Sequence, residues 1–382
     1  MKNSKTITFL ALIALLCLST FGNGQVIKNE IVLGNIISLE SIVLNEERDF
    51  YVYLPAGYEQ SDEKYPVMYV LDGETKFTIS AAIANFLANN RQIPQMIVIG
   101  IPNVARNRDF TPAIDERMQN SGGADNFISF LDKELIEFVD NTYRTQNFKV
   151  LFGHSLCGMF SAYTLFTNPD LFNAYIAASP YLMMSNEYVI KKAEEVLIAQ
   201  TDFNNQLYMS IGNEPTYFKS LDKFKSLLNK NDSELNWILH KYDDEDHASI
   251  PFRTISDGLG FIFSDWRLTI VTAMKGVDAI KKHIDNSNNK YGFTKQMEPT
   301  LNFAGYQLLQ AGEIEKAIEI FEYNIELYPS SANVYDSLGD GYDAQGSKKK
   351  ALTSYTKAVS LAETNNNPSL AIFKQNLERL KN

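Results

Sequence analysis

The segment Gly153-His-Ser-Leu-Cys-Gly158 holds the residues of this chain best suited to covalent catalysis. Its Gly-x-Ser-x-Cys spacing differs in one position from Gly-x-Ser-x-Gly, in which the serine stands on a sharp turn between a strand and a helix. Residues 148–152 predict a buried strand before Ser155, and residues 157–166 predict a helix after it. Small residues are needed at such a turn because the helix packs close to the strand. Ser155 is therefore the candidate nucleophile, and the alternative is an ordinary turn in which it only caps the helix.

A serine hydroxyl attacks a carbonyl carbon only if a base takes its proton, and histidine suits this task near neutral pH. The sequence has four histidines. His247 follows the predicted strand 237–239 in a polar loop, at the edge where parallel strands end. The other three fall beside the serine, inside a strand and in a later helix, where structural or surface roles explain them. His247 is the candidate base, and a solvated acidic loop is the alternative.

The acid that orients the histidine should lie between the serine and the histidine in the sequence. Glu214 fits, because it follows the predicted strand 207–211 at a point where its carboxylate can reach the imidazole and fix the tautomer. The rivals are three aspartates in the loop before the histidine: Asp243, Asp244 and Asp246. Glu214 could equally be a loop carboxylate without a catalytic role.

Two backbone amides are candidates for binding the negative oxygen of a tetrahedral intermediate. One belongs to Leu156, directly after the serine, and the other to Glu74, in the loop after the predicted strand 67–71. Gly73 in that loop could instead serve only the turn. These two amides complete the set of groups that acyl transfer requires.

Arg106 and Arg108 lie in the loop after the predicted strand 96–101 and could hold an acidic group of a substrate. Salt bridges within the loop are the alternative use. Substrate preference depends on loops such as 103–122 and 181–206, so the sequence does not identify the substrate. Aromatic residues in these loops permit an aromatic acyl group without requiring one.

The elements that must position these residues follow an α/β pattern. Short β-rich runs up to residue 54 predict antiparallel opening strands, and apolar strands then alternate with helices, which predicts a mainly parallel central sheet. Apolar residues at three- and four-residue steps over 127–138 predict one amphipathic helix. The α/β domain is expected to span residues 25–266. Its later predicted strands are 67–71, 96–101, 150–152, 174–178, 207–211 and 237–239.

Composition limits the class of protein. The chain has 382 residues, 45% of them apolar and 21% charged, with a formal net charge of −11. These proportions are those of an ordinary globular protein and argue against disorder. Net acidity without a long basic run argues against nucleic acid as a partner. Two cysteines are too few for a disulfide framework.

The first 24 residues read as an export signal, with a lysine-containing start, an apolar run over 7–18 and small residues at 22–24. The mature chain is expected to begin near Gln25, to be periplasmic or secreted, and to have no integral membrane span. A membrane anchor is the alternative, but the run is shorter than the roughly 20 residues needed to cross hydrocarbon. A lipoprotein that uses Cys17 is a weaker alternative, because bulky Leu16 precedes it.

The C-terminal segment 301–382 carries an internal repeat. Five residue pairs lie 34 positions apart, which is the period of a tetratricopeptide repeat. Residues 267–300 are expected to form a helical linker, with a polar connection over 286–290. Two units rarely stand alone, so the module should pack on its neighbour, recruit a protein partner or mediate self-association. The pairs are Gly305/Gly339, Gly312/Gly346, Ala317/Ala351, Phe321/Tyr355 and Leu327/Leu361.

Five further stretches accompany the Ser155 turn: Val52-Tyr-Leu-Pro55, Val70-Leu-Asp-Gly73, Gly100-Ile-Pro-Asn103, Arg108-Asp-Phe-Thr-Pro112, and His247 followed by Ile250-Pro251. With the Ser155 turn they resemble the putative-esterase family of α/β-hydrolases, which includes ferric-siderophore, feruloyl and acetylxylan esterases, S-formylglutathione hydrolases and mycolyltransferases. The resemblance covers residues 27–265. The C-terminal repeats resemble those of exported enzymes in the siderophore-esterase-like branch.

The resemblance implies an α/β-hydrolase fold and hydrolysis of a small-molecule ester through a Ser-His centre, without a metal or an organic cofactor. Cys157 stands where the family has glycine. Some relatives work with a Ser-His pair alone, so Glu214 need not be required. Two alternatives stay open: an acyltransferase that uses the same residues, and a hydrolase-fold scaffold whose repeats recruit a protein.

Overall fold

The computed structural model of the protein describes residues 32–199, 202–231 and 233–381. The predicted signal at residues 1–24, Cys17 and the predicted mature start at Gln25 lie outside the described residues. The compact unit Gly34–Asn382 holds every element described below.

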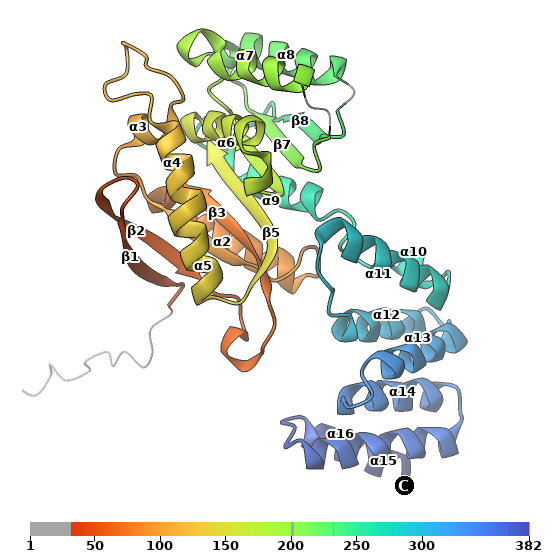
Figure 1. Ribbon diagram of the computed structural model, residues 1–382. Helices are drawn as coiled ribbons and strands as arrows, with labels where there is room; N and C mark the ends of the chain where they lie inside the picture. Colours follow the sequence, from red (N-terminus) through yellow and green to blue (C-terminus); the bar gives the residue numbers. More distant parts are fainter. Residues whose placement is uncertain (1–31, 200–201, 232, 382) are drawn as a thin grey trace, which may run out of the picture. The chain divides into compact units, whose positions relative to one another are not determined.

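One sheet organises the α/β domain within the described ranges, with its eight strands in the order β1-β2-β4-β3-β5-β6-β7-β8 (Figure 1). β1 and β2 pair antiparallel, as do β2 and β4, and all the other neighbours pair in parallel. The prediction of antiparallel opening strands followed by a mainly parallel sheet is confirmed. The strands are β1 (Asn35–Ser41), β2 (Glu46–Tyr53), β3 (Tyr65–Leu71), β4 (Ile97–Ile101), β5 (Thr145–His154), β6 (Ala174–Ala178), β7 (Gln206–Ile211) and β8 (Asn236–Lys241).

Helices cover both faces of the sheet, which explains why its central strands are apolar throughout. Every residue of β3 is buried, with Tyr69 and Leu71 in one core and Met68 and Val70 in the other. The core that contains Met68 also includes side chains of α2 (Gly73–Asn89) and α9 (Pro251–Ile262). The opposite core includes side chains of α4 (Ala124–Phe130), α5 (Ile136–Thr142), α6 (Leu156–Thr167), α7 (Met184–Ala199) and α8 (Pro215–Lys230).

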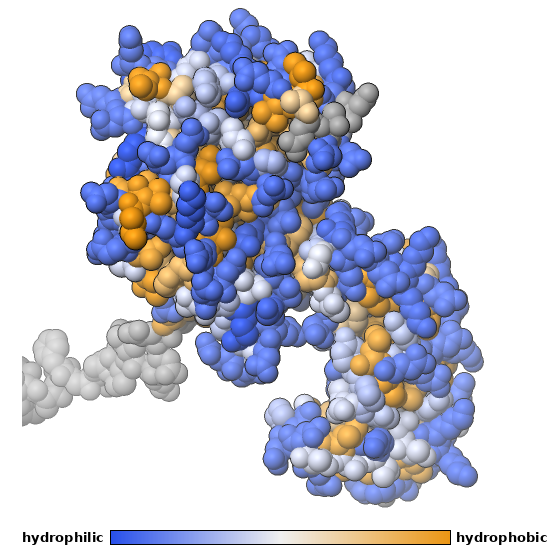
Figure 2. All heavy atoms as spheres, in the orientation of Figure 1, coloured by the Kyte–Doolittle hydropathy of each residue, from blue (hydrophilic) through white to orange (hydrophobic). Residues whose placement is uncertain are grey.

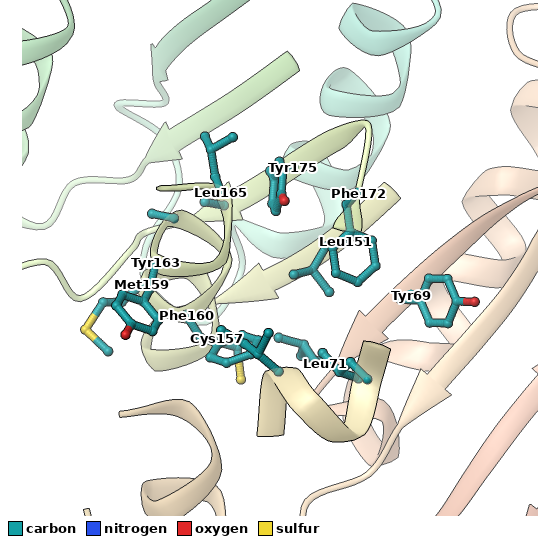
Figure 3. Close-up of a cluster of buried hydrophobic side chains, with 14 of the residues drawn as sticks. Tyr69, Leu71, Leu151, Cys157, Met159, Phe160, Tyr163, Leu165, Phe172 and Tyr175 are labelled. Carbon is teal, nitrogen blue, oxygen red and sulfur yellow. The ribbon is translucent and has the colours of Figure 1, made fainter. Parts of the chain in front are cut away.

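The predicted helix over 127–138 is helical throughout, although a π-helical segment, Leu131–Leu135, joins α4 to α5. Helix α6 starts directly after the candidate nucleophile and is buried over nearly its whole length. Figure 3 shows side chains of α6, including Met159 and Phe160, gathered with Leu151 of β5 and Tyr175 of β6. This packing fixes the start of α6 against the end of β5.

The C-terminal region is helical. Its two hairpins pair α12 with α13 and α14 with α15, and equivalent glycines make the close contacts. A methyl group on Gly305 would lie 2.3 Å from the ring of Phe321, and one on Gly339 would lie 2.5 Å from the ring of Tyr355. The helices are α10 (Ile270–Ala273), α11 (Val277–Tyr291), α12 (Glu298–Gln310), α13 (Ile314–Leu327), α14 (Ala332–Ala344), α15 (Lys348–Thr364) and α16 (Leu370–Lys381).

The predicted polar connection over 286–290 is wrong, because these residues belong to helix α11. Ser287 is buried and donates a 2.7 Å hydrogen bond to the carbonyl oxygen of Asp265. One turn later, the Tyr291 ring packs 5.2 Å from that of Phe263 and joins the core beneath the sheet. These tertiary contacts outweigh the weak helix propensity of an asparagine-rich segment.

Surface character agrees with a globular chain. The face in Figure 2 is mostly hydrophilic, with apolar side chains in small separate patches. In the part of the chain that the structure describes, no helix is both long and apolar enough to cross a membrane.

Candidate active site

Ser155 stands on the turn between β5 and α6 with a strained backbone, φ 59° and ψ −115°. Gly153 makes the turn possible, because a methyl group there would lie 2.1 Å from the carbonyl oxygen of Cys157. At Gly158 the corresponding distance to the Ala178 carbonyl oxygen is 2.9 Å. The Ser155 amide donates to that same carbonyl at 2.8 Å. The two tight positions are therefore glycines, and the neighbouring strand fixes the serine backbone.

Cys157 is fully buried between these glycines and packs rather than reacts. Burial raises the pKa of its thiol well above the ordinary value, so the thiol stays protonated. Its sulfur lies 3.8 Å from Nη2 of Arg106. The family glycine is thus replaced here by a small side chain that helps to support Arg106.

His247 and Glu214 meet at the carboxyl edge of the sheet, after β8 and β7 respectively. Nδ1 of His247 contacts Oε2 of Glu214. The other carboxylate oxygen accepts hydrogen bonds from the Ser179 hydroxyl, at 2.5 Å, and from the Gly212 amide, at 3.2 Å. Glu214 is 8% exposed, so these bonds hold a buried carboxylate in one orientation. Because Nδ1 is engaged, Nε2 is the nitrogen that can take a proton from a nucleophile.

The imidazole of His247 lies beside the residue that precedes the nucleophile. Its ring centroid is 4.5 Å from that of His154 and 5.4 Å from that of Tyr217. Among the described residues, no hydrogen bond joins the Ser155 hydroxyl to His247. In ligand-free enzymes such bonds are often long and tighten when substrate binds. The candidate base His247 thus lies beside Tyr217, which lines the same pocket as Ser155.

His154 differs from a catalytic base in the pKa of its imidazole, since a general base works best with a pKa near the ambient pH. Burial and the nearby His247 lower the pKa of its imidazole to about 4. His154 is consequently neutral near pH 7, and it places no fixed positive charge next to His247.

The two predicted oxyanion donors begin neighbouring helices. Leu156 is the first residue of α6 and Glu74 the second of α2, so neither amide has an intrahelical acceptor. The preceding strands, β5 and β3, are parallel neighbours, which brings both helix starts to the same edge of the sheet. Asn103 braces the Glu74 turn by donating from its amide and side chain to the Glu74 carboxylate, at 3.2 and 2.7 Å.

Arg106 and Arg108 differ in position. Arg106 lines the pocket at Ser155 and makes two hydrogen bonds to Asp72, at 2.8 and 3.0 Å. Burial would raise the pKa of the Asp72 carboxyl, but Arg106 and Asn103 outweigh it and hold that pKa below its ordinary value. The structure does not bring Arg108 to this pocket, because its guanidinium binds Glu46 and Asp109 instead.

A pocket of about 390 Å³ opens beside Ser155. Sequence reasoning missed Arg117, which is held by Asp115 through bonds of 2.8 and 2.6 Å, and Tyr217, whose ring lies 5.7 Å from that of Tyr181. Arg117 falls in a loop expected to set substrate preference, which is its only signal in the sequence, whereas Tyr181 is one of the loop aromatics that permit an aromatic acyl group. The pocket is lined by Arg106, Asp115, Arg117, Met118, Ser155, Leu156, Tyr181 and Tyr217.

Comparison with known proteins identifies relatives that are named as esterases or as a serine hydrolase. Ferri-bacillibactin esterase BesA of Bacillus subtilis is 28% identical over 191 residues, which cover 42% of this chain and 63% of BesA, less than two thirds of its length. The siderophore enterobactin esterase of Emericella nidulans is 26% identical over 254 residues, which cover 53% of this chain and 84% of that protein. The solved structure of an IroE-like serine hydrolase from Shewanella oneidensis is 28% identical, with a TM-score of 0.66, and the match covers 77% of this chain and 99% of that one.

These relationships place the chain in the class of carboxylic ester hydrolases built on the α/β-hydrolase fold. Residues 41–248, more than half of the chain, match the family described as Putative esterase. The chain belongs to that family.

Proposed function

We propose that the protein is a serine esterase that cleaves a carboxylic ester through an acyl-enzyme on Ser155. The observation that carries the proposal is the contact of Glu214 with His247 beside a serine on a strained strand-to-helix turn. Ester hydrolysis needs a nucleophile, a base and an orienting acid, and these three side chains are of the required types.

In the proposed reaction the Ser155 hydroxyl oxygen attacks the ester carbonyl carbon while Nε2 of His247 takes its proton. Glu214 stabilises the imidazolium that forms, and the amides of Leu156 and Glu74 bind the oxyanion. The intermediate collapses as His247 returns the proton to the departing alcohol. Water, deprotonated by the same imidazole, then releases the acid from Ser155.

The residues that line the pocket support a substrate whose acyl or alcohol group is both anionic and aromatic. Two guanidinium groups, those of Arg106 and Arg117, line it, and each is oriented by a carboxylate. Tyr181 and Tyr217 supply aromatic surface. Planar guanidinium groups suit carboxylates and other planar oxyanions. Because relatives are named as esterases of siderophores, a siderophore ester is the substrate we propose to test first.

The proposal extends to both ends of the chain. Residues 1–24 act as an export signal, and the enzyme works outside the cytoplasm. Residues 301–382 form a tetratricopeptide-repeat module behind a helical linker at 267–300. Its support is the equivalence of the hairpins: Gly312 and Gly346, 34 positions apart, both lie between paired helices with positive φ, 80° and 79°. The module packs on the hydrolase domain or recruits a partner protein.

The test is hydrolysis of a short and a longer 4-nitrophenyl ester by the purified protein. Ser155→Ala and His247→Ala should each lower kcat/KM by about a thousandfold or more. Ser226→Ala and His240→Ala are the matched controls, since Ser226 is exposed on α8 and His240 exposed on β8, and both should retain activity. Hydrolysis by both site variants at the wild-type rate would disprove the assignment. A siderophore triester substrate then tests the substrate class separately.

A further inference from the structure

A second cavity lies at the opposite edge of the sheet from Ser155. It has a volume of about 350 Å³, and its walls include the first two residues of β3, Tyr65 and Pro66, and Gln146 near the start of β5. Strand β5 runs from this cavity to the Ser155 turn. Nine residues of strand span about 30 Å. The cavity is therefore separate from the proposed active site.

Lys295 is the unusual residue of this cavity. Its side chain is 4% exposed, and its ammonium group donates to the carbonyl oxygen of Trp266 and lies 4.5 Å from the centre of the Trp266 ring. An ammonium group has three donors, and buried charges are normally paired. Within the described ranges, no carboxylate forms an ion pair with Lys295. Burial alone lowers the pKa of this ammonium group to about 8.

The rest of the lining combines charged residues with apolar and uncharged polar ones. Lys64 and Arg91 line the cavity and are exposed, and Glu63, also exposed, is the only acidic residue in the described lining. Seven lining residues are apolar and seven are uncharged and polar. The apolar ones are Pro66, Ala88, Ile93, Pro94, Trp266, Phe293 and Pro299, and the polar ones are Tyr65, Asn89, Gln95, Gln146, Thr294, Gln296 and Thr300. The cavity thus offers a buried cation with unused donors, further cations at its exposed part, and apolar walls.

We propose that this cavity binds a small organic anion, a carboxylate carried on an apolar ring or chain. The carboxylate accepts hydrogen bonds from Lys295, and the apolar body lies against Trp266 and Phe293. A neutral ligand of the same shape would leave the buried ammonium group without its counter-ion. This site is additional to the ester-cleaving site and does not depend on the proposed activity.

The experiment uses Trp266 as the reporter. The sequence contains two tryptophans, so Trp237→Phe leaves Trp266 as the single tryptophan. Benzoate is titrated into this variant, with benzamide as the neutral probe of matched shape. Benzoate should change the Trp266 fluorescence in a saturable way and raise the melting temperature, and benzamide should do neither at the same concentrations.

Lys295→Met in the same background keeps the length of the side chain and removes the charge. It should weaken benzoate binding about ten- to a hundredfold. Lys282→Met is the matched control, because Lys282 is exposed on α11, and it should bind as the parent does. Absence of saturable binding to the parent, equal affinity in Lys295→Met, or equally tight binding of benzamide would each overturn the proposal.

A second variant keeps the test decisive if Lys295→Met does not fold. Lys64→Glu combined with Arg91→Glu reverses two exposed charges of the lining and leaves the core intact. The proposal predicts weaker benzoate binding by at least about threefold, with the loss shrinking as salt is added. An unchanged affinity in this variant would count against an anion site.

Discussion

The Ser155 turn and the helical hairpins both depend on glycine, but different groups lie opposite the glycine in each. Gly153 faces the backbone carbonyl of Cys157, whereas Gly339 faces the ring of Tyr355. A ring can shift by rotation of its side chain, but a carbonyl at the start of a helix moves only with the helix. Close packing in the α/β domain therefore fixes the backbone at the site, whereas in the hairpins it sets the spacing of helices.

A buried carboxylate of the α/β domain and one of the C-terminal helical region also differ in the groups that contact them. Glu214 contacts His247, a side chain that can become a cation, and it also accepts bonds from Ser179 and Gly212. Asp336, on α14, is 6% exposed and accepts from the amide of Asn376, at 3.1 and 3.0 Å. Burial raises the pKa of Asp336 to about 6. Glu214 is thus paired with a group that can carry a positive charge, whereas the carboxylate of Asp336 is held by a neutral amide.

The largest effect is expected at Glu214, the proposed acid of the site. Glu214→Gln keeps the shape of the side chain but removes the charge that stabilises the imidazolium, and the amide can favour the wrong tautomer of His247. Loss of the acid in a serine hydrolase triad costs up to about 10⁴ in kcat. We expect kcat/KM for a 4-nitrophenyl ester to fall about 10³- to 10⁴-fold, while Glu245→Gln, in the neighbouring loop, changes it little. Near-wild-type turnover by Glu214→Gln would show that Ser155 and His247 work as a pair.

The glycine comparison predicts the next largest effect. Gly153→Ala forces a methyl group against backbone and should lower the free energy of unfolding by about 3 kcal/mol or more. Gly339→Ala meets a movable ring and should cost less, about 1–2 kcal/mol. Gly260→Ala is the control, because nothing lies within 4 Å of its methyl position in helix α9, and it should stabilise by up to about 1 kcal/mol. Urea unfolding curves measure all three, and a reversed order of Gly153 and Gly339 would break the comparison.

Much of this site follows from local patterns in the sequence. The apolar runs that predict β5, β7 and β8 place Ser155 one, Glu214 three and His247 six residues after the strand ends, and parallel strands end at one edge of a sheet. The structure brings the last two into contact. These candidates could be predicted from the sequence because only a few residues separate each of them from the end of a strand.

The positions of other residues depend on tertiary contacts, which local sequence patterns do not encode. Arg106 and Arg108 have the same local setting, yet Asp72 holds one at the pocket and Glu46 holds the other away from it. Tyr217 reaches the site because α8 starts directly after Glu214, a consequence of loop geometry. The helix across 286–290 formed because Ser287 and the next turn found partners in the α/β domain.

Asp336 provides a pH test of the carboxylate comparison. The folded protein binds this proton more tightly than the unfolded chain, because the pKa rises from 3.8 to about 6 on folding. Stability is therefore unaffected below about pH 4 and falls as the pH rises from 3.8 toward 6. Asp340 nearby adds to the rise in pKa, and Arg379 opposes it. Asp336→Asn should stabilise the protein at pH 7.5 by about 1–2 kcal/mol, with solvent screening allowed for, and should do little at pH 4.

The control for this test lies on the same helix. Asp343 pairs with Arg379 at 2.9 Å and is partly exposed, so Asp343→Asn should remove a weak ion pair and destabilise slightly at pH 7.5. Melting temperatures at the two pH values measure both variants. An Asp336→Asn protein that is less stable than the parent at pH 7.5 would show that the Asn376 contact compensates the buried charge fully.

The smallest effect is expected at the exposed rim of the site, where charge is neither buried nor part of the chemistry. Arg117 is 71% exposed, and Asp115 holds its guanidinium in place. An exposed cation contributes little to binding an anion, because water and salt screen its charge. Arg117→Met should therefore reduce the preference for a 4-nitrophenyl hemisuccinate over a neutral ester of similar length by about three- to fivefold, with kcat for the neutral ester unchanged. Lys225→Met, which is exposed on α8, controls for the loss of one positive charge. If the preference falls equally in both variants, it arises from the net charge of the protein, and the pocket does not select for anions through Arg117.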